Sequence, residues 1–259
     1  MKNYQFLTSE ILGLSVYTGK TDGVISSIVS LAKQSTGAYV CFVNAHMAVE
    51  ASNDPQFKEI VNNANLACPD GISIAKCISW MHGKPQQRIS GPEILPILLS
   101  EAQKNSLRVF ILGGTEIVLS DFVKKANREF QGVICGSYSP PFRKLTEAED
   151  SDIVKRINDS NANMVFVSLG CPKQEKWMAT HKSFIKACML GLGFAIPVYA
   201  GHAKRAPHWM QIMGLEWLHR LKNDPKNLWR RYLHTNIAFI WKIIFEAITQ
   251  SISCNRTSI

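Results

Sequence analysis

The chain has 259 residues, of which 46% are hydrophobic and 19% charged, a composition that excludes wholesale disorder and fits one large domain with or without an appendage. Its formal net charge of +9 favours an anionic partner such as nucleic acid, a phosphorylated small molecule or an acidic membrane. The N-terminus lacks the basic start and apolar stretch of a signal peptide, and no window is apolar enough to predict a spanning helix.

Apolar runs alternate with helical patterns along the first 200 residues. We expect strands at 38–44, 66–68, 108–114, 133–138, 163–170 and 184–193, and helices at 54–64, 71–83, 92–105, 115–130, 146–160 and 172–181. Strands that alternate with helices predict an α/β fold with a mostly parallel sheet covered on both faces. In such a fold the functional residues lie at the carboxyl ends of the strands.

After Gly201 the pattern changes to helices only, rich in Trp and Arg, so we expect a core at 1–201 and a helical appendage at 202–259. The appendage has nine Lys or Arg residues against three Asp or Glu residues. Residues 228–250 carry apolar side chains at three- and four-residue steps, which predicts an amphipathic helix. It would lie in the interface of an anionic membrane, or pack on its own domain or another subunit.

The stretch "LACPDGISIAK" (66–76) places Asp70 between a short strand and a helix. Burial at this strand end would raise the pKa of its carboxyl toward a value useful for a general base. The alternative is that Asp70 caps the helix that follows.

Two other strand ends carry polar side chains. "VNAH" contains Asn44 and His46, and a lone histidine is more often structural than catalytic. "GCPKQEKW" (170–177) places Gln174 and Glu175 in a first helical turn, where an amide and exposed N–H groups suit a sugar or a phosphate. A polar helix start without a ligand would have the same pattern.

Glycines follow a further strand in "LGG", where Gly113 and Gly114 form a turn that either approaches a phosphate or is purely structural. Arg205, Arg220, Arg230 and Arg231 of the appendage could form a guanidinium cluster that neutralises a departing diphosphate. The alternative for these arginines is a solvated basic face.

The D-x-D match at Asp150 and Asp152 is rejected as a metal site, because acids in a first helical turn complement the helix dipole. Seven scattered cysteines without C-x-x-C pairs favour packed thiols in a reducing compartment and give zinc poor support. No dinucleotide fingerprint and no Walker motif is present.

The sequence resembles the WecG/TagA/CpsF family of bacterial glycosyltransferases over nearly its whole length. The resemblance rests on the segments "VNAHMAVEA", "ANLACPDGISIAK", "RISGPEIL", "VFILGGTE", "VSLGCPKQEKW" and "KRAPHWMQIMGLEWLHRLKNDPKNLWRRY". The last two segments are the most specific. "GSYSPPF" (136–142) is similar to the branch of the family that builds exopolysaccharide repeats, so the identity of the sugar stays open.

The resemblance implies a Rossmann-like fold and an inverting transfer without metal or other cofactor. The donor would be a UDP-sugar and the acceptor a sugar on a polyprenyl diphosphate, as in synthesis of cell-surface polysaccharides such as teichoic acid. The enzyme would be cytoplasmic and peripheral on the inner face of the plasma membrane, with the anionic membrane surface as a partner.

By the same resemblance Asp70 is the base and Gly71 belongs to its motif. Asn44 and Gln174 fall on pocket positions, the arginine-rich tail contacts the diphosphate, and His46 lies where many relatives carry Glu or another polar residue.

Two other classes of function remain as alternatives at this point. One is a nucleotide-dependent oxidoreductase on the same fold, which the missing fingerprint disfavours. The other is a non-enzymatic module that binds membrane or nucleic acid through its positive charge; the transferase hypothesis involves no nucleic acid. Association of the chain with itself stays open.

Overall fold

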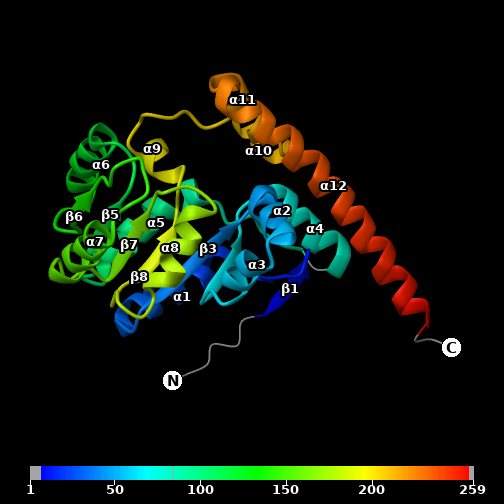
Figure 1. Ribbon diagram of the computed structural model, residues 1–259, viewed down its shortest axis with the longest axis horizontal. Coiled ribbons are helices and arrows are strands. Elements are labelled where there is room, and N and C mark those ends of the chain that lie inside the picture. Colours follow the sequence, from blue (N-terminus) through cyan, green and yellow to red (C-terminus); the bar gives the residue numbers. More distant parts are fainter. Residues whose placement is uncertain (1–6, 84, 257–259) are drawn as a thin grey trace.

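The fold is an α/β sandwich built on one parallel sheet (Figure 1). The computed structural model describes residues 7–83 and 85–256, without side chains at 227, 231 and 250–256. Six strands are ordered β4-β3-β8-β7-β5-β6 and pair in parallel. They are β3 (Ala38–Val43), β4 (Leu66–Pro69), β5 (Val109–Leu112), β6 (Ile134–Tyr138), β7 (Met164–Val167) and β8 (Cys188–Gly191).

Helices cover both faces of this sheet because alternate residues of each strand point to opposite sides. One apolar layer includes α1 (Thr21–Gln34), α5 (Gly91–Lys104), α6 (Glu116–Glu129) and α9 (Ala195–Tyr199). The other includes α2 (Ala45–Asn53), α3 (Pro55–Asn62), α4 (Ile72–His82), α7 (Glu147–Asp159) and α8 (Lys173–His181). In β3, Val40 and Phe42 join the first layer, whereas Tyr39, Cys41 and Val43 join the second.

The predicted parallel sheet with helices on both faces is confirmed, and so are the helix starts at Asp54 and Thr115. Each of these two side chains accepts a hydrogen bond from the backbone three residues on, as an N-cap does. The sequence patterns missed α1, α2 and a short antiparallel hairpin of β1 (Thr8–Ile11) and β2 (Leu14–Tyr17). The hairpin turns through Leu12 and Gly13, both with positive φ, and packs on the α2–α4 side of the sheet.

The residues after Gly201 form α10 (His208–Met213), α11 (Glu216–Asn223) and the long α12 (Pro225–Arg256). Figure 1 shows α12 as a rod that begins above the sheet, passes α2 and α4 and extends beyond the rest of the molecule. Tyr232, Phe239 and Ile243 are buried, and the last two join the second apolar layer. Among the described residues, no helix is both long enough and apolar enough to cross a bilayer.

Candidate active site

A cleft of about 750 Å³ opens at the carboxyl ends of four neighbouring strands. Its floor includes Asn44 after β3, Asp70 after β4, Ser168 after β7 and Gly193 after β8. The carboxyl ends of parallel strands meet at one edge of the sheet, so these residues converge although they are far apart in the sequence. The opposite wall is formed by the appendage, which contributes side chains of α11 and the first part of α12.

Asp70 does not cap the helix that follows it. The N-cap of α4 is Gly71, which forms no side-chain cap hydrogen bond. The Asp70 carboxylate instead accepts a hydrogen bond from the Gly91 N–H at the start of α5, with a distance of 3.2 Å between Oδ1 and N. Its own N–H donates to the Val43 carbonyl at 2.9 Å, which fixes the strand end against β3. The carboxylate is therefore held on the cleft floor by the beginning of a different helix.

Burial raises the pKa of the Asp70 carboxyl above its ordinary value. The Arg220 guanidinium, the Gly91 N–H and the Asn44 amide all favour the ionised form and oppose this shift, and Glu216 adds to it. The balance leaves a carboxyl that is easier to protonate than a solvent-exposed aspartate, which is the property required of a general base.

Asn44 and His46 lie on either side of the start of α2. The Asn44 side chain caps this helix by accepting a hydrogen bond from the Met47 N–H at 3.1 Å, and its amide also bonds to Asp70. His46 lines the cleft and contacts the appendage, with 3.3 Å between its Nδ1 and the Thr235 Oγ1. Asn44 thus orients the carboxylate, whereas His46 connects the core wall to α12.

Gln174 lines the cleft, and its hydrogen bonds fix the orientation of its side-chain amide. Its Nε2 donates to the Gly191 carbonyl at 3.0 Å and to the Glu175 Oε1 at 2.8 Å, and its Oε1 accepts from the Gly170 N–H at 3.2 Å. Both amide hydrogens are used, so Gln174 presents only a carbonyl lone pair to a ligand.

Glu175 is fully buried behind Gln174 and is not among the residues that line the cleft. Its Oε2 has no hydrogen-bond partner among the described residues, and burial raises the pKa of its carboxyl. The structure therefore places Glu175 beneath the site, where it contacts Gln174 rather than a ligand.

The four arginines of the appendage occupy different places. Arg220 lines the cleft, and its guanidinium carbon lies 3.9 Å from the centre of the Phe194 ring. Arg205 is not part of the lining, and Arg230 is exposed above the Trp229 ring. The side chain of Arg231 lies outside the described residues. Of the arginines expected to form a guanidinium cluster, Arg220 is thus the one whose described side chain lines the cleft.

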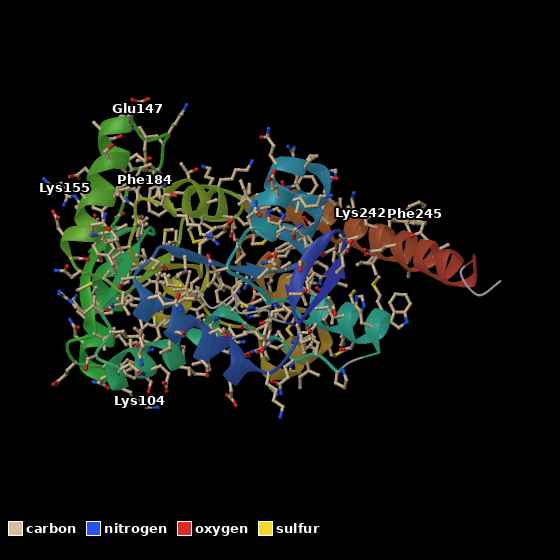
Figure 2. All side chains as sticks on the ribbon, turned by 90° about the horizontal axis from the view of Figure 1, so that it is seen from below. Lys104, Glu147, Lys155, Phe184, Lys242 and Phe245 are labelled. Carbon is tan, nitrogen blue, oxygen red and sulfur yellow. The ribbon has the colours of Figure 1, made fainter. Side chains whose placement is uncertain are left out.

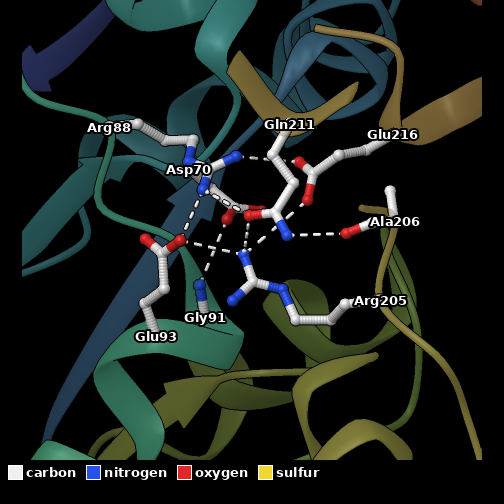
Figure 3. Close-up of polar contacts among 8 residues, drawn as sticks. All are labelled: Asp70, Arg88, Gly91, Glu93, Arg205, Ala206, Gln211 and Glu216. Atoms are coloured by element: carbon white, nitrogen blue, oxygen red, sulfur yellow. Dashed lines mark hydrogen bonds and ion pairs between the residues drawn. The ribbon is translucent and has the colours of Figure 1, made fainter. Parts of the chain in front are cut away.

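Arg205 belongs to a polar clasp that ties the appendage to the core (Figure 3). Its Nη2 donates to the Glu93 Oε1 at 2.9 Å and to the Gln211 Oε1 at 2.7 Å. Arg88 of the core also bonds to Glu93 and Gln211 and forms an ion pair of 3.1 Å with Glu216. Two arginines, two glutamates and one glutamine thus join the start of α5 to α10 and α11 beside Asp70.

Sequence reasoning missed Arg88, Glu93, Gln211 and Glu216 as members of the site. Arg88 and Glu93 lie within the motif "RISGPEIL", which carried the family resemblance but no role. No local pattern links residue 88 to residue 216, because their pairing depends on the path of the appendage.

The predicted glycines are also separated by the structure. Gly71 lines the cleft next to Asp70, whereas Gly113 and Gly114 are not among the lining residues. Gly113 has a φ of +97°, and a Cβ there would meet the Ser168 carbonyl at 2.4 Å, so the residue is required for close packing of two strand ends. This matches the structural alternative for the "LGG" turn.

Asp150 and Asp152 of the D-x-D match are engaged in contacts within the fold. Asp150 accepts a hydrogen bond from the Trp177 Nε1 at 2.8 Å and pairs with the His181 Nε2 at 2.9 Å. Asp152 pairs with Arg156 on the same helix. The Asp150 contacts join α7 to α8, and both aspartates lie outside the cleft lining.

Comparison with known proteins agrees with this arrangement. Residues 9–253 match the family described as glycosyl transferase WecG/TagA/CpsF. The chain is 33% identical over 202 residues to the N-acetylglucosaminyldiphosphoundecaprenol N-acetyl-beta-D-mannosaminyltransferase of Bacillus spizizenii, a match that covers 77% of this chain and 76% of the relative. It is 34% identical over 202 residues to the enzyme of the same name from Bacillus subtilis strain 168, covering 77% of each chain.

These matches favour the transferase over the oxidoreductase and the non-enzymatic binding module. The family match spans both walls of the cleft, since its residues run from β1 into the last turns of α12. The chain belongs to the WecG/TagA/CpsF family of glycosyltransferases.

Proposed function

We propose that the chain is an inverting, metal-independent transferase that moves an N-acetylhexosaminyl group from UDP to a sugar on a polyprenyl diphosphate. The names of the two Bacillus relatives favour N-acetylmannosamine as the transferred sugar and N-acetylglucosaminyl-diphospho-undecaprenol as the acceptor. In this proposal residues 1–201 supply the catalytic floor, and residues 202–259 supply the second wall of the cleft and the contact with the membrane.

The observation that carries the proposal is the half-buried Asp70 on the cleft floor with a raised carboxyl pKa. Asp70 takes the proton from the acceptor hydroxyl. The electron pair left on this oxygen forms a bond to the anomeric carbon from the face opposite UDP, and the bond between that carbon and the diphosphate oxygen breaks. The electron pair leaves with UDP, so the configuration inverts.

Positive charge for the departing diphosphate comes from the appendage wall. Arg220 and Lys204 line the cleft, and arginine matches phosphate oxygens in a bidentate manner. Ala45 and His46 at the start of α2 also line it, and the N-terminal end of a helix favours a bound anion. Gln174 accepts a hydrogen bond from a hydroxyl or N–H group of the ligand, because its amide hydrogens are already used.

The acceptor lipid explains the exposed apolar surface of α12. Trp229, Leu233, Ile237, Ile240, Ile244 and Ile248 are exposed at three- and four-residue steps along the helix. A face of this kind with basic residues nearby suits a helix that lies in the interface of an anionic bilayer. We place the enzyme on the inner leaflet, where the polyprenyl diphosphate presents its sugar.

The test is Asp70→Asn. We expect the transfer rate to fall by about 10²–10⁴-fold, the usual contribution of a general base, while calorimetry shows unchanged UDP binding. Asp152→Asn, which removes an exposed carboxylate outside the cleft, is the matched control. Near-wild-type turnover in the Asp70 variant would refute the base.

The pH profile gives an independent check. The base acts in its ionised form, so kcat/KM falls as pH decreases through the pKa of Asp70. Because burial raises this pKa, the acid limb lies above that of an ordinary aspartate. The limb should be absent from the residual activity of the Asp70→Asn variant.

A further inference from the structure

A second hollow, of about 560 Å³, lies farther along α12. Its core side is formed by Leu12 of the hairpin turn, Ser52 at the end of α2 and Lys58 of α3. Its other side is formed by Trp241, Lys242 and Phe245 of α12. We call it the distal groove, and nothing in the proposed transfer reaction uses it.

The distal groove is a built part of the fold. Both carboxylate oxygens of Glu246 accept a hydrogen bond from the Leu12 N–H, at 3.1 and 3.0 Å. This contact anchors α12 to the β1–β2 turn. The same contact engages the carboxylate of the groove, and Glu246 forms no ion pair with a lysine in the described part of the chain.

Two cations of the groove are unpaired. The ammonium groups of Lys58 and Lys242 form no ion pair or hydrogen bond among the described residues, while Lys176 on the neighbouring helix is paired with Asp54. Lys242 and Phe245 lie three residues apart and therefore on one face of α12, where Figure 2 shows them together. The groove thus combines two available positive charges with aromatic walls.

The aromatic walls are continuous with the apolar face of α12. Trp241 and Phe245 are each 69% exposed and flank the stripe that includes Ile237, Ile240 and Ile244. A tryptophan between a lysine and an apolar stripe is typical of side chains at the boundary between lipid headgroups and acyl chains. The groove therefore lies at the edge of the surface that we place on the bilayer.

We propose that the distal groove binds the phosphate headgroup of an anionic glycerophospholipid. Lys58 and Lys242 hold the phosphate, and Trp241 and Phe245 contact the glycerol and the upper acyl chain. The biological sense of this site rests on the proposed function, because only a membrane-bound acceptor requires a fixed position on the bilayer.

The groove would set the depth of the active site. His46 contacts Thr235 at the cleft, and Ser52, six residues later on α2, lines the groove. At 1.5 Å per residue this separation is about 9 Å along the helix. A headgroup in the groove would hold the cleft within the headgroup layer, where the sugar of a polyprenyl diphosphate is located.

The test measures sedimentation of the full chain with vesicles of phosphatidylcholine, with and without phosphatidylglycerol. We expect Lys58→Gln/Lys242→Gln to bind the anionic vesicles about 30-fold more weakly, since each lysine near an anionic surface contributes about fivefold. Binding to pure phosphatidylcholine should stay unchanged. The matched control is Lys104→Gln/Lys155→Gln, which removes the same charge at the end of the molecule opposite α12 (Figure 2).

Equal losses in the two double variants would overturn the groove, because the effect would then be one of net charge. Transfer to a water-soluble acceptor with a short prenyl chain separates this proposal from the proposed function. The Lys58/Lys242 variant should retain wild-type turnover with it, and a loss there would overturn the headgroup role. If the wild-type enzyme itself showed no turnover, the proposed function would be refuted. The headgroup proposal would in that case be decided by the vesicle-binding measurement.

Discussion

The two walls of the cleft are held in place by different physical interactions. The core wall lies at the ends of strands whose side chains are almost completely buried, and its Asp70 carboxylate is fixed by backbone groups of β3 and α5. The appendage wall depends on the polar clasp and on a few buried side chains of α12. Of the eighteen exposed large hydrophobic residues among the described ones, twelve follow Gly201, so the appendage leaves uncovered what the core buries.

In the proposed function this difference separates the catalytic step, on the core wall, from access of the acceptor, on the appendage wall. A general base has to be held within a fraction of an ångström, which backbone hydrogen bonds in a packed sheet achieve. A wall that meets a lipid-linked acceptor has to expose apolar surface, which a folded core cannot do without loss of stability. The two walls can therefore be perturbed separately, and the following experiments do so.

The largest effect is expected from removal of all residues after Asn227. This deletion removes Leu228, Tyr232 and Thr235 from the cleft lining, and we expect transfer to fall by at least about 100-fold because the substrates lose one wall. Among the described residues the first apolar layer contains none from the appendage, so the sheet should stay folded. Steady-state transfer and far-UV circular dichroism are the measurements.

A deletion after Thr249 is the matched control, because it keeps all of these lining residues. If the shorter chain retained full turnover, α12 would have no role in the site. A cooperative loss of the circular dichroism signal would contradict the independence of the two walls.

A smaller effect is expected from the clasp. Arg205→Ala and Glu93→Ala should show a coupling free energy of about 1–2 kcal/mol in a double-mutant cycle, since the two side chains share one network. The same cycle on Arg143 and Glu149, an ion pair with an arginine that is 57% exposed, should give a smaller coupling free energy because solvent screens exposed charges. Urea unfolding would report the coupling free energy of each pair, and proteolysis within residues 201–207 would report that of the clasp independently.

The clasp cycle also decides between two roles of Arg205. If it acts through the clasp, the double variant transfers sugar no more slowly than either single variant. If Arg205 contacts the diphosphate directly, its loss would slow transfer equally in the presence and the absence of Glu93.

The sequence predicted the core wall far better than the appendage wall. Periodicity located each strand of the sheet, and the rule that active sites lie at the carboxyl ends of strands brought Asn44, Asp70 and Gln174 together in advance. These assignments depend on local patterns and on one topological rule. The hairpin of β1 and β2 escaped because four-residue strands have too few alternations to show a period.

The appendage could not be predicted in the same way because its contacts are long-range. Its amphipathic helix was predicted, but the partners of Arg205 and Arg220 depend on the direction in which the chain returns over the sheet. Arg230 follows Leu228 by two residues, which places it on the opposite face of the helix from the cleft lining. The number of arginines in the sequence does not show which of them reach the cleft.

A substitution at Glu175 tests whether this buried carboxyl contributes to the free energy of unfolding or to the geometry of the cleft. Burial raises its pKa from 4.5, so the folded state binds the proton more tightly than the unfolded chain. Its contribution to stability is complete below the unfolded pKa and is lost as pH rises from there through the folded pKa, by at most about 1.4 kcal/mol per pH unit. Glu175→Gln should remove this slope in urea unfolding.

The same variant keeps an oxygen for the Gln174 amide, so transfer should change by less than about threefold. Glu149→Gln is a control of opposite sign. Its partner Arg143 lowers the pKa of Glu149 to about 2, so stability from this carboxylate is lost as pH falls. An unchanged slope in the Glu175 variant would mean that the buried carboxyl ionises equally in the folded and unfolded chain.

The smallest effect is expected from removal of divalent cations. Both oxygens of Asp150 are engaged by Trp177 and His181 of α8, and Asp152 is paired with Arg156 within α7, so a metal at the D-x-D match would have to displace these contacts. Positive charge in the cleft comes from Arg220 and Lys204, which are on the chain itself. We therefore expect turnover after exhaustive chelation to equal that of the untreated enzyme. A loss that added Mg²⁺ or Mn²⁺ restores would show that the cleft residues do not suffice for the leaving diphosphate. If Asp150→Asn lost activity without such rescue, the defect would instead come from the position of α8 and its Gln174.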